Sequence, residues 1–512
     1  MKSLTRQSPD VYFAAFSRYI VILLPLLAMA LSAMSQQTFH GSGSRDLYPD
    51  GVAGGRAKLR ASTLVSAEAT PFPTLGVHYV YAQAGEIIAM ASSVQGLGSG
   101  RIRITPPTGS AITSPNNSTG RIAGGLVGGI TTNRDAEKAG PRLPGSGSGG
   151  GYIPWTHTAA TTGVYKVEFI SGLGEATTDE GSATNDPGRA NIAANANWTQ
   201  ANNTIYIQAW DISVSNAAGT EWIPGRTWTN VLNMDIFSIT QSGQSWIFSN
   251  VGGFYGKAYV LTKDGYVYRV DNNGNNGITF SFFSNNNGFV DANNEPTYLS
   301  NISAAAADFT HDPRTADANG NITNKIFYSA PDPNLPAIAT GQGLPGGETW
   351  LRVERIPPSL ISPKIIGYDG TEGQISNKGG HFYFETDNLA SRYTITISPP
   401  ADQPGLFAPR VLTGPAQEGE NWIPWDGKDG NGDDLPPGYY GPQVGVSLQT
   451  AEVHFPYIDM ELNPNGIIIE LLSTDYNTTL QDNVFWNDTN IPTGGVLGSV
   501  SSPINASHTV TE

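Results

Sequence analysis

Residues 421–440 constrain the fold of this chain more than any other segment. They read NWIPWDGKDGNGDDLPPGYY, in which Trp425 leads into an acidic, glycine-rich turn and a Pro-Pro-Gly step precedes two tyrosines. The apolar run 444–448 follows. Aromatic residues on both sides of a cluster of Gly, Asn and Asp are typical of two strands joined by a tight turn. We therefore expect a β-hairpin here.

The order W-D-G-K-D-x-N-G-x-x-L-P-x-G-x-Y resembles the closing hairpin of the Ig-like sandwich found in flagellar hook-capping proteins. That domain recurs in secreted and gliding-motility-associated surface proteins of Bacteroidota-type bacteria. The strand-like segments 381–385, 393–398 and 422–425 fall where such a domain has its strands, although the chain adds 399–405 and ends the motif with GYYGPQ. The resemblance implies an Ig-like scaffold domain over 350–456.

A shorter version of the same layout occurs earlier in the chain. I-P-W at 153–155 is followed by a polar turn and by G-V-Y at 163–165, much as I-P-W at 423–425 is followed by G-Y-Y at 438–440. Two copies of one layout suggest sandwich domains that close with similar hairpins.

The composition agrees with short strands joined by many turns. Hydrophobic residues make up 39% of the 512 residues and aromatic residues 10%, which is enough for real cores, while 60 residues are glycine and only 14% are charged. There is no cysteine, so disulfides, thiolate metal sites and cysteine nucleophiles are excluded. We predict an all-β protein built from tandem β-sandwich (Ig-like) domains with long loops rich in Gly, Asn, Ser and Pro.

The sequence divides into five expected segments. They are a signal peptide at 1–35, a β-sandwich domain with a long Gly-rich insertion at 36–215, a β-rich middle domain at 216–349, the hook-capping-type domain at 350–456, and a strand followed by a linker at 457–512. Because no C-terminal sorting domain is evident, we expect the chain to be the N-terminal part of a longer polypeptide.

The N-terminus has the three parts of a secretory signal. Basic residues precede the apolar run 19–33, and Ala33 and Ser35 place small side chains before a cut at Gln36. The alternative is a membrane anchor, but the run is shorter than the roughly 20 residues that span a bilayer. Cleavage would remove three basic residues and one acidic residue and take the formal net charge from −16 to −18.

The acidic turn holds the densest set of oxygen ligands, namely Asp426, Asp429, Asn431, Asp433 and Asp434. Oxygen-bearing side chains at the alternate positions 429, 431 and 433 match the first half of an EF-hand loop. However, Asp434 stands where that loop needs glycine, and Tyr440 stands where it needs a bidentate Glu. A looser calcium site and a set of Asx turns that satisfy backbone groups both explain these residues. Calcium is the only cofactor we consider.

Two tryptophans are candidates for a ligand platform. Trp222 and Trp228 flank a Pro-Gly-Arg step, so we expect them to be more exposed than the tryptophans inside strands. Exposed indole rings can stack on sugar rings, whereas buried ones fill sandwich cores. Both interpretations stay open at this stage.

Known catalytic patterns do not support an enzyme. The seven histidines are scattered without an H-E-x-x-H motif, and neither G-x-S-x-G nor a Walker loop occurs. Two formal G-x-G-x-x-G matches, at 145–150 and 341–346, do not follow a strand and open a helix, so they do not predict dinucleotide binding. A hydrolase of an unrecognised type would need carboxylates clustered in a deep cleft.

These observations lead to one principal expectation and one alternative. We expect a non-enzymatic, exported cell-surface or extracellular scaffold of the adhesin type, with surface glycans or other surface proteins as partners and no membrane span after signal cleavage. Its acidic surface disfavours nucleic acid as a partner. The alternative is a carbohydrate-binding module or accessory domain of a secreted polysaccharide-degrading enzyme, for which exposed tryptophans on one sandwich face would argue.

Overall fold

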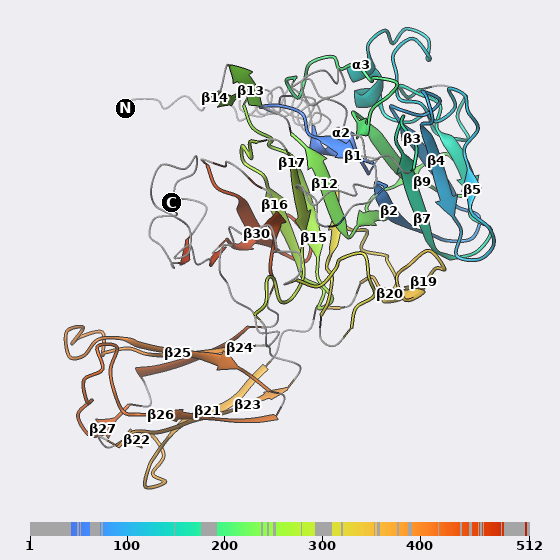
Figure 1. The fold of residues 1–512 in the computed structure, drawn as a ribbon. Helices are drawn as coiled ribbons and strands as arrows, with labels where there is room; N and C mark the ends of the chain where they lie inside the picture. The colour runs from blue at the N-terminus through green and yellow to red at the C-terminus, as the bar shows by residue number, and fades with distance from the viewer. Residues whose placement is uncertain are drawn as a thin grey trace, which may run out of the picture. The chain divides into compact units, whose positions relative to one another are not determined.

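The structure, a computed structural model, is built almost entirely of β-strands, which confirms the all-β class (Figure 1). Two short helices accompany the strands in the described part of the chain, α2 (Ser44–Leu47) and α3 (Asn133–Ala139). The predicted signal peptide at 1–35 lies outside the described residues. These are 42–485 and 507–508, without 49–50, 52, 62–71, 73–74, 148, 176–191, 237–238, 243–244, 249–251, 278, 292–309, 319–320, 353, 356–358, 376–377, 388–391, 418, 441–442, 450–452, 459, 461–462, 464 and 483.

Three sheets form what we call the body, which comprises the described residues of 42–350 and 454–481. A ten-stranded sheet has the order β31 (Thr479–Gln481), β30 (Ile468–Leu472), β16 (Val267–Asp271), β15 (Lys257–Leu261), β18 (Lys325–Phe327), β11 (Thr227–Thr229), β2 (Val77–Ala82), β7 (Gly163–Ile170), β4 (Arg101–Thr105) and β5 (Ile112–Thr113). A five-stranded sheet has the order β29 (Tyr457–Ile458), β17 (Thr279–Phe283), β12 (Val231–Asp235), β1 (Lys58–Arg60) and β8 (Tyr206–Ile207). A four-stranded sheet has the order β10 (Trp222–Ile223), β9 (Trp210–Ser215), β3 (Ile87–Ser92) and β6 (Trp155–Thr158).

Three two-stranded pairs complete the strands outside the segment 359–449. They are β13 (Ile239–Ser242) with β14 (Ser245–Phe248), β19 (Ile338–Thr340) with β20 (Glu348–Trp350), and β32 (Val484–Phe485) with β33 (Ser507–His508).

Strands from distant parts of the sequence are neighbours in the body. Trp228 of β11 pairs with Tyr79 of β2, so one sheet joins strands from both sides of the domain boundary that we placed at 215/216. β29 and β30 return after residue 450 to pair with β17 and β16. Side chains from 47 to 328 form one hydrophobic cluster, against which Tyr457 and Ile469 pack.

Residues 359–449 form a second set of strands with a core of their own, which we call the inserted unit because the chain returns to the body after it. One layer has the order β21 (Ser359–Gly367), β23 (Gly380–Asp387) and β26 (Gly419–Trp425), with β22 (Gln374–Ile375) paired to β27 (Gly438–Tyr439); the other has the order β25 (Arg410–Pro415), β24 (Arg392–Ile397) and β28 (Val444–Gln449) (Figure 1). Phe382, Ile395 and Trp425 belong to one buried cluster that draws on both layers. No described strand of the inserted unit pairs with a strand of the body.

The expected hairpin over 421–440 is wrong in its pairing. β26 pairs with β23 and β28 pairs with β24, so the segment between them connects the two layers instead of folding back within one sheet. The motif at 153–165 behaves in the same way, because β6 and β7 lie in different sheets. A pattern of aromatic residues around a turn is common to hairpins and to such connections, and the strand partner that distinguishes them is far away in the sequence.

Both connections place a tyrosine at the same local contact. The hydroxyl of Tyr165 donates to the carbonyl of Thr161 at 2.8 Å, and the hydroxyl of Tyr440 donates to the carbonyl of Pro436 at 2.7 Å. In each case the acceptor lies four residues upstream. Tyr165 is the third residue of β7 and Tyr440 lies between β27 and β28, and a tyrosine near the start of a strand that bonds back to the backbone is called a tyrosine corner. The repeated motif therefore encodes a corner between sheets.

Candidate functional site

The two tryptophans singled out from the sequence have different surroundings. Trp228 lies within β11 and is fully buried, with ring centroids 5.9 Å from those of Tyr79 and Phe327. Its ring faces are covered by the core, which corrects the expectation of an exposed loop position. Trp222 lies in β10 opposite Ser215 and is half-buried. Stacking of a ligand on Trp222 stays a prediction.

Asp429 organises the acidic turn. Its carboxylate accepts hydrogen bonds from the backbone N–H groups of Ala408 at 3.0 Å, Asn431 at 2.8 Å and Asp433 at 3.0 Å. Hydrogen bonds to the ionised form, of which that from Ala408 contributes most, lower the pKa of Asp429. Both oxygens of Asp429 are thus engaged with the backbone, as in an Asx turn.

Two other members of the acidic set bind Lys428. The carboxylate of Asp434 accepts from Lys428 Nζ at 2.8 Å, and that of Asp426 accepts from the N–H of Lys428 at 3.1 Å. Asn431 and Asp433 are exposed at the tip. Within the described residues no group of three or more His, Asp or Glu side chains is placed to hold a metal ion together. A calcium site at this turn stays a prediction.

Asp426 instead lines an open hollow at the edge of the inserted unit. The hollow measures about 340 Å³ and is bordered by Arg410 and Leu412 of β25 and by Pro424 and Trp425 of β26. Arg410 Nη2 lies 3.6 Å from Asp426 Oδ2, and both side chains are partly exposed. A hydrogen-bond donor and an acceptor therefore lie side by side in a solvent-accessible recess.

An exposed aromatic surface adjoins this hollow. Trp422 and Pro424 are two residues apart in β26, so their side chains share the outer face of the sheet, and Trp422 is 50% exposed. Tyr383 of β23 is directly opposite Trp422 in the strand register, with ring centroids 4.7 Å apart. His381 lies at the end of the pair, 6.3 Å from the ring centroid of Trp422. We call Trp422, Tyr383 and Pro424 the aromatic strip.

Two carboxylates fix the rings of the aromatic strip. The indole N–H of Trp422 donates to Glu420 at 3.2 Å, and the hydroxyl of Tyr383 donates to Glu385. This last hydrogen bond favours the protonated phenol and raises the pKa of Tyr383 to about 12. Both acceptors bind the polar edges of the rings, so these hydrogen bonds do not cover the ring faces.

The exposure of Trp422 is not among the predictions from sequence, although the sequence carries a signal for it. Trp422 and Trp425 are three residues apart in one strand, and an odd spacing in a strand places two side chains on opposite faces. In a two-layered unit one face is the core and the other is solvent. Since Trp425 is buried against Phe382, Trp422 must face outward.

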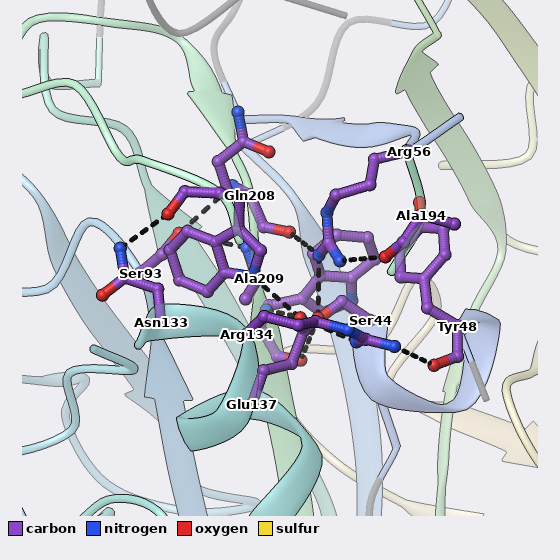
Figure 2. Close-up of polar contacts among 12 residues, drawn as sticks. Ser44, Tyr48, Arg56, Ser93, Asn133, Arg134, Glu137, Ala194, Gln208 and Ala209 are labelled. Atoms are coloured by element: carbon purple, nitrogen blue, oxygen red, sulfur yellow. Dashed lines mark hydrogen bonds and ion pairs between the residues drawn. The ribbon is translucent and has the colours of Figure 1, made fainter. Parts of the chain in front are cut away.

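The body contains a second concentration of polar side chains, which is buried (Figure 2). The carboxylate of Glu137 in α3 accepts from Arg56 at 2.8 Å, Arg134 at 3.0 Å, Ser44 at 2.6 Å and the indole N–H of Trp198 at 2.8 Å. Burial alone would raise the pKa of Glu137, but the two guanidinium groups outweigh it and lower the pKa.

The donors of this network continue into the surrounding backbone. Arg56 donates to the carbonyls of Gln208 at 2.7 Å and Ala194 at 3.3 Å, and Arg134 donates to the carbonyl of Tyr48 at 2.6 Å. Figure 2 shows these groups converging from α2, α3 and the neighbouring strands. The four hydrogen bonds that the carboxylate of Glu137 accepts all come from side chains of the same chain. The network therefore joins segments of the body and does not form a substrate site.

Comparison with protein-family profiles, with curated proteins and with solved structures found no match. Among the described residues, no helix has the length and the apolar character that crossing a lipid bilayer requires.

Proposed function

We propose that this chain is a non-enzymatic, exported scaffold of the adhesin type, located at the cell surface or outside the cell, and that the inserted unit is an Ig-like β-sandwich domain of the hook-capping kind. The observation that carries the proposal is the two-layered unit with its own core, which interrupts a continuous β body. Such an arrangement presents a small module on a larger support. The absence of cysteine and the signal-like N-terminus are consistent with export from a bacterial cell.

The tyrosine corner supports the Ig-like assignment. Tyr440 lies where the chain leaves one layer for the other, which is the position of this feature in Ig-like sandwiches. The two layers have three principal strands each and enclose one core, as expected for a small sandwich. The similar corner at Tyr165 supports a tandem arrangement, with a sandwich-like part in the body.

Location and N-terminal processing test the proposal. We expect an antibody against residues 359–449 to label intact cells, and the antigen to disappear when intact cells are treated with protease. We also expect mass spectrometry of the mature protein to find Gln36 at its N-terminus. Labelling only after lysis, together with a retained N-terminal segment, would contradict export.

A second function is favoured by a specific observation, the exposed ring of Trp422. It supports the alternative of a carbohydrate-binding module or accessory domain of a polysaccharide-degrading enzyme. The two functions differ in the partners of the native protein. An accessory domain would copurify with, or be encoded in one polypeptide with, a catalytic domain that degrades the bound glycan.

A further inference from the structure

We infer that the aromatic strip and the adjoining hollow form a binding site for neutral polysaccharide, with Trp422 as the main stacking platform and Arg410 and Asp426 as hydroxyl-binding groups. The inference deepens the proposed function and rests on it, because it assumes that the exported protein meets glycans outside the cell. The binding itself, however, is a property of the purified chain.

The first argument is the exposure and fixation of the platform. A half-exposed indole on a sheet face is costly to leave in water, and here its ring is held by a cross-strand contact with Tyr383 and by the hydrogen bond to Glu420. Because these contacts fix the ring before a ligand arrives, little side-chain freedom is lost on binding. Tryptophan is also enriched among residues that dominate binding energies.

The second argument is the chemistry of the hollow. Arg410 donates from Nη1 to the carbonyl of Asp429 at 3.1 Å, while its Nη2 faces the carboxylate of Asp426 at 3.6 Å, beyond the length of a good hydrogen bond. A sugar hydroxyl both donates and accepts, so it can satisfy a guanidinium and a carboxylate together. Pro424 is exposed between this pair and Trp422 and continues the apolar surface.

The third argument is charge, which selects among possible occupants. Glu385 and Glu420 flank the rings, and the chain carries a net charge of −16, so a polyanion would be repelled. A basic peptide would bind poorly, because both carboxylates already accept hydrogen bonds from the ring edges. The positively charged Arg410 also lies at the end of the aromatic strip. A neutral glycan meets neither obstacle, since its C–H face can lie on the rings while its hydroxyls reach the polar groups.

The test is binding of the full chain to insoluble cellulose, β-1,3-glucan, chitin and mannan, with alginate as the anionic probe and polylysine as the cationic one. We expect depletion of the protein by at least one neutral polysaccharide. The dissociation constant of that complex should rise at least about tenfold in Trp422→Ala. Arg410→Ala should weaken binding less, and Trp422→Phe should restore part of the affinity.

Matched controls separate binding from folding. Tyr368 is 71% exposed in the same unit but lies outside the aromatic strip, so Tyr368→Ala should bind like the unsubstituted chain. Each variant should keep the circular dichroism spectrum and melting profile of the parent chain. Lack of binding to every neutral probe would overturn the inference while leaving the surface location intact. Binding that Trp422→Ala does not change, or binding to alginate or polylysine alone, would also overturn it.

Discussion

The body and the inserted unit use the same corner motif but stabilise it differently. Tyr165 and Tyr440 make equivalent hydrogen bonds where the chain changes sheets. In the body the surrounding interior contains ion pairs, such as Arg56 with Glu137, whose side chains are at most 1% exposed. In the described part of the inserted unit every ion pair is partly exposed, and the buried cluster is apolar.

This difference shows two ways of holding sheets together. The body joins segments that are distant in sequence, and buried hydrogen-bonded charges can specify which segments meet, at a cost in desolvation. The inserted unit joins strands from one continuous segment, 359–449, for which alternating side chains suffice. A substitution should therefore have its largest effect on an ion pair in the body and on an aromatic side chain in the inserted unit.

The largest expected effect is that of Glu137→Ala. Removal of this carboxylate leaves the guanidinium groups of Arg56 and Arg134 buried without their anionic partner, which typically costs about 3–5 kcal/mol. Denaturant unfolding of the body should show a loss of this size. The matched control is Glu372→Ala, which breaks the exposed pair with Lys364 and should cost less than about 1 kcal/mol. Equal effects of the two substitutions would remove the distinction between the regions.

Phe382→Ala should have a comparable effect that is confined to the inserted unit. Phe382 is fully buried and stacks on Trp425 with ring centroids 5.2 Å apart, and truncation of such a residue costs about 3–5 kcal/mol. Scanning calorimetry should show one transition moved to lower temperature and the transition of the body unchanged. A shift of both transitions would mean that the two regions unfold together.

The response to pH should also differ between the regions. Burial raises the pKa of Asp46 to about 8, despite the neighbouring Arg45 and a hydrogen bond from the N–H of Gly43, and burial raises the pKa of Asp211 to about 6. Because the folded body binds these two protons more tightly than the unfolded chain, the contribution of Asp46 and Asp211 to the free energy of unfolding should fall as the pH rises from about 4 to about 8. Asp46→Asn should flatten this decline. A decline of the same size in the variant would contradict the assignment.

Asp429 in the inserted unit should act in the opposite direction. Its folded pKa is lowered by backbone N–H groups, so it contributes stability above the usual aspartate pKa of about 4 and loses this contribution as the pH falls further. Asp429→Ala should lower the melting temperature of the inserted unit at pH 7 and have less effect at pH 3. Asp433→Ala, at the exposed tip of the same turn, is the control and should leave the melting temperature unchanged.

The smallest effects should come from the two corners. Tyr165→Phe and Tyr440→Phe each remove one hydroxyl that donates to a backbone carbonyl, and each should cost about 1 kcal/mol in its own region. Melting profiles of the two variants should therefore differ in which transition moves. A null effect of one substitution would show that the two corners are not equivalent.

The strands could be predicted from the sequence where alternation is local. The strand-like segments at 381–385 and 393–398 correspond to β23 and β24, and the strand expected within 457–512 corresponds to β30. Helix α3 lies within the domain expected at 36–215, for which the sequence pattern predicts a long Gly-rich insertion and no helix. Its start is nevertheless encoded, because Thr132 is an N-cap residue whose hydroxyl accepts from the N–H of Asp135.

The partners of the strands could not be predicted in the same way. Nothing in the local pattern of β26 distinguishes β23 from β28 as its neighbour, and nothing in 457–472 indicates a return to the body. The contact of Glu137 with Arg56 joins residues 81 positions apart. One part of the candidate site could be predicted, because the residue spacing indicates that Trp422 faces outward. The position of Arg410 beside Asp426 could not, because it depends on the packing of the two layers.

The most direct test of the account is the thermal unfolding of residues 355–453 expressed alone. If the inserted unit has an independent core, it should unfold cooperatively, with a melting temperature within about 5 °C of its transition in the whole chain. A difference of that size corresponds to about 1 kcal/mol in a domain of this length. An isolated segment without a cooperative transition, or a whole chain that melts in a single step, would contradict the account.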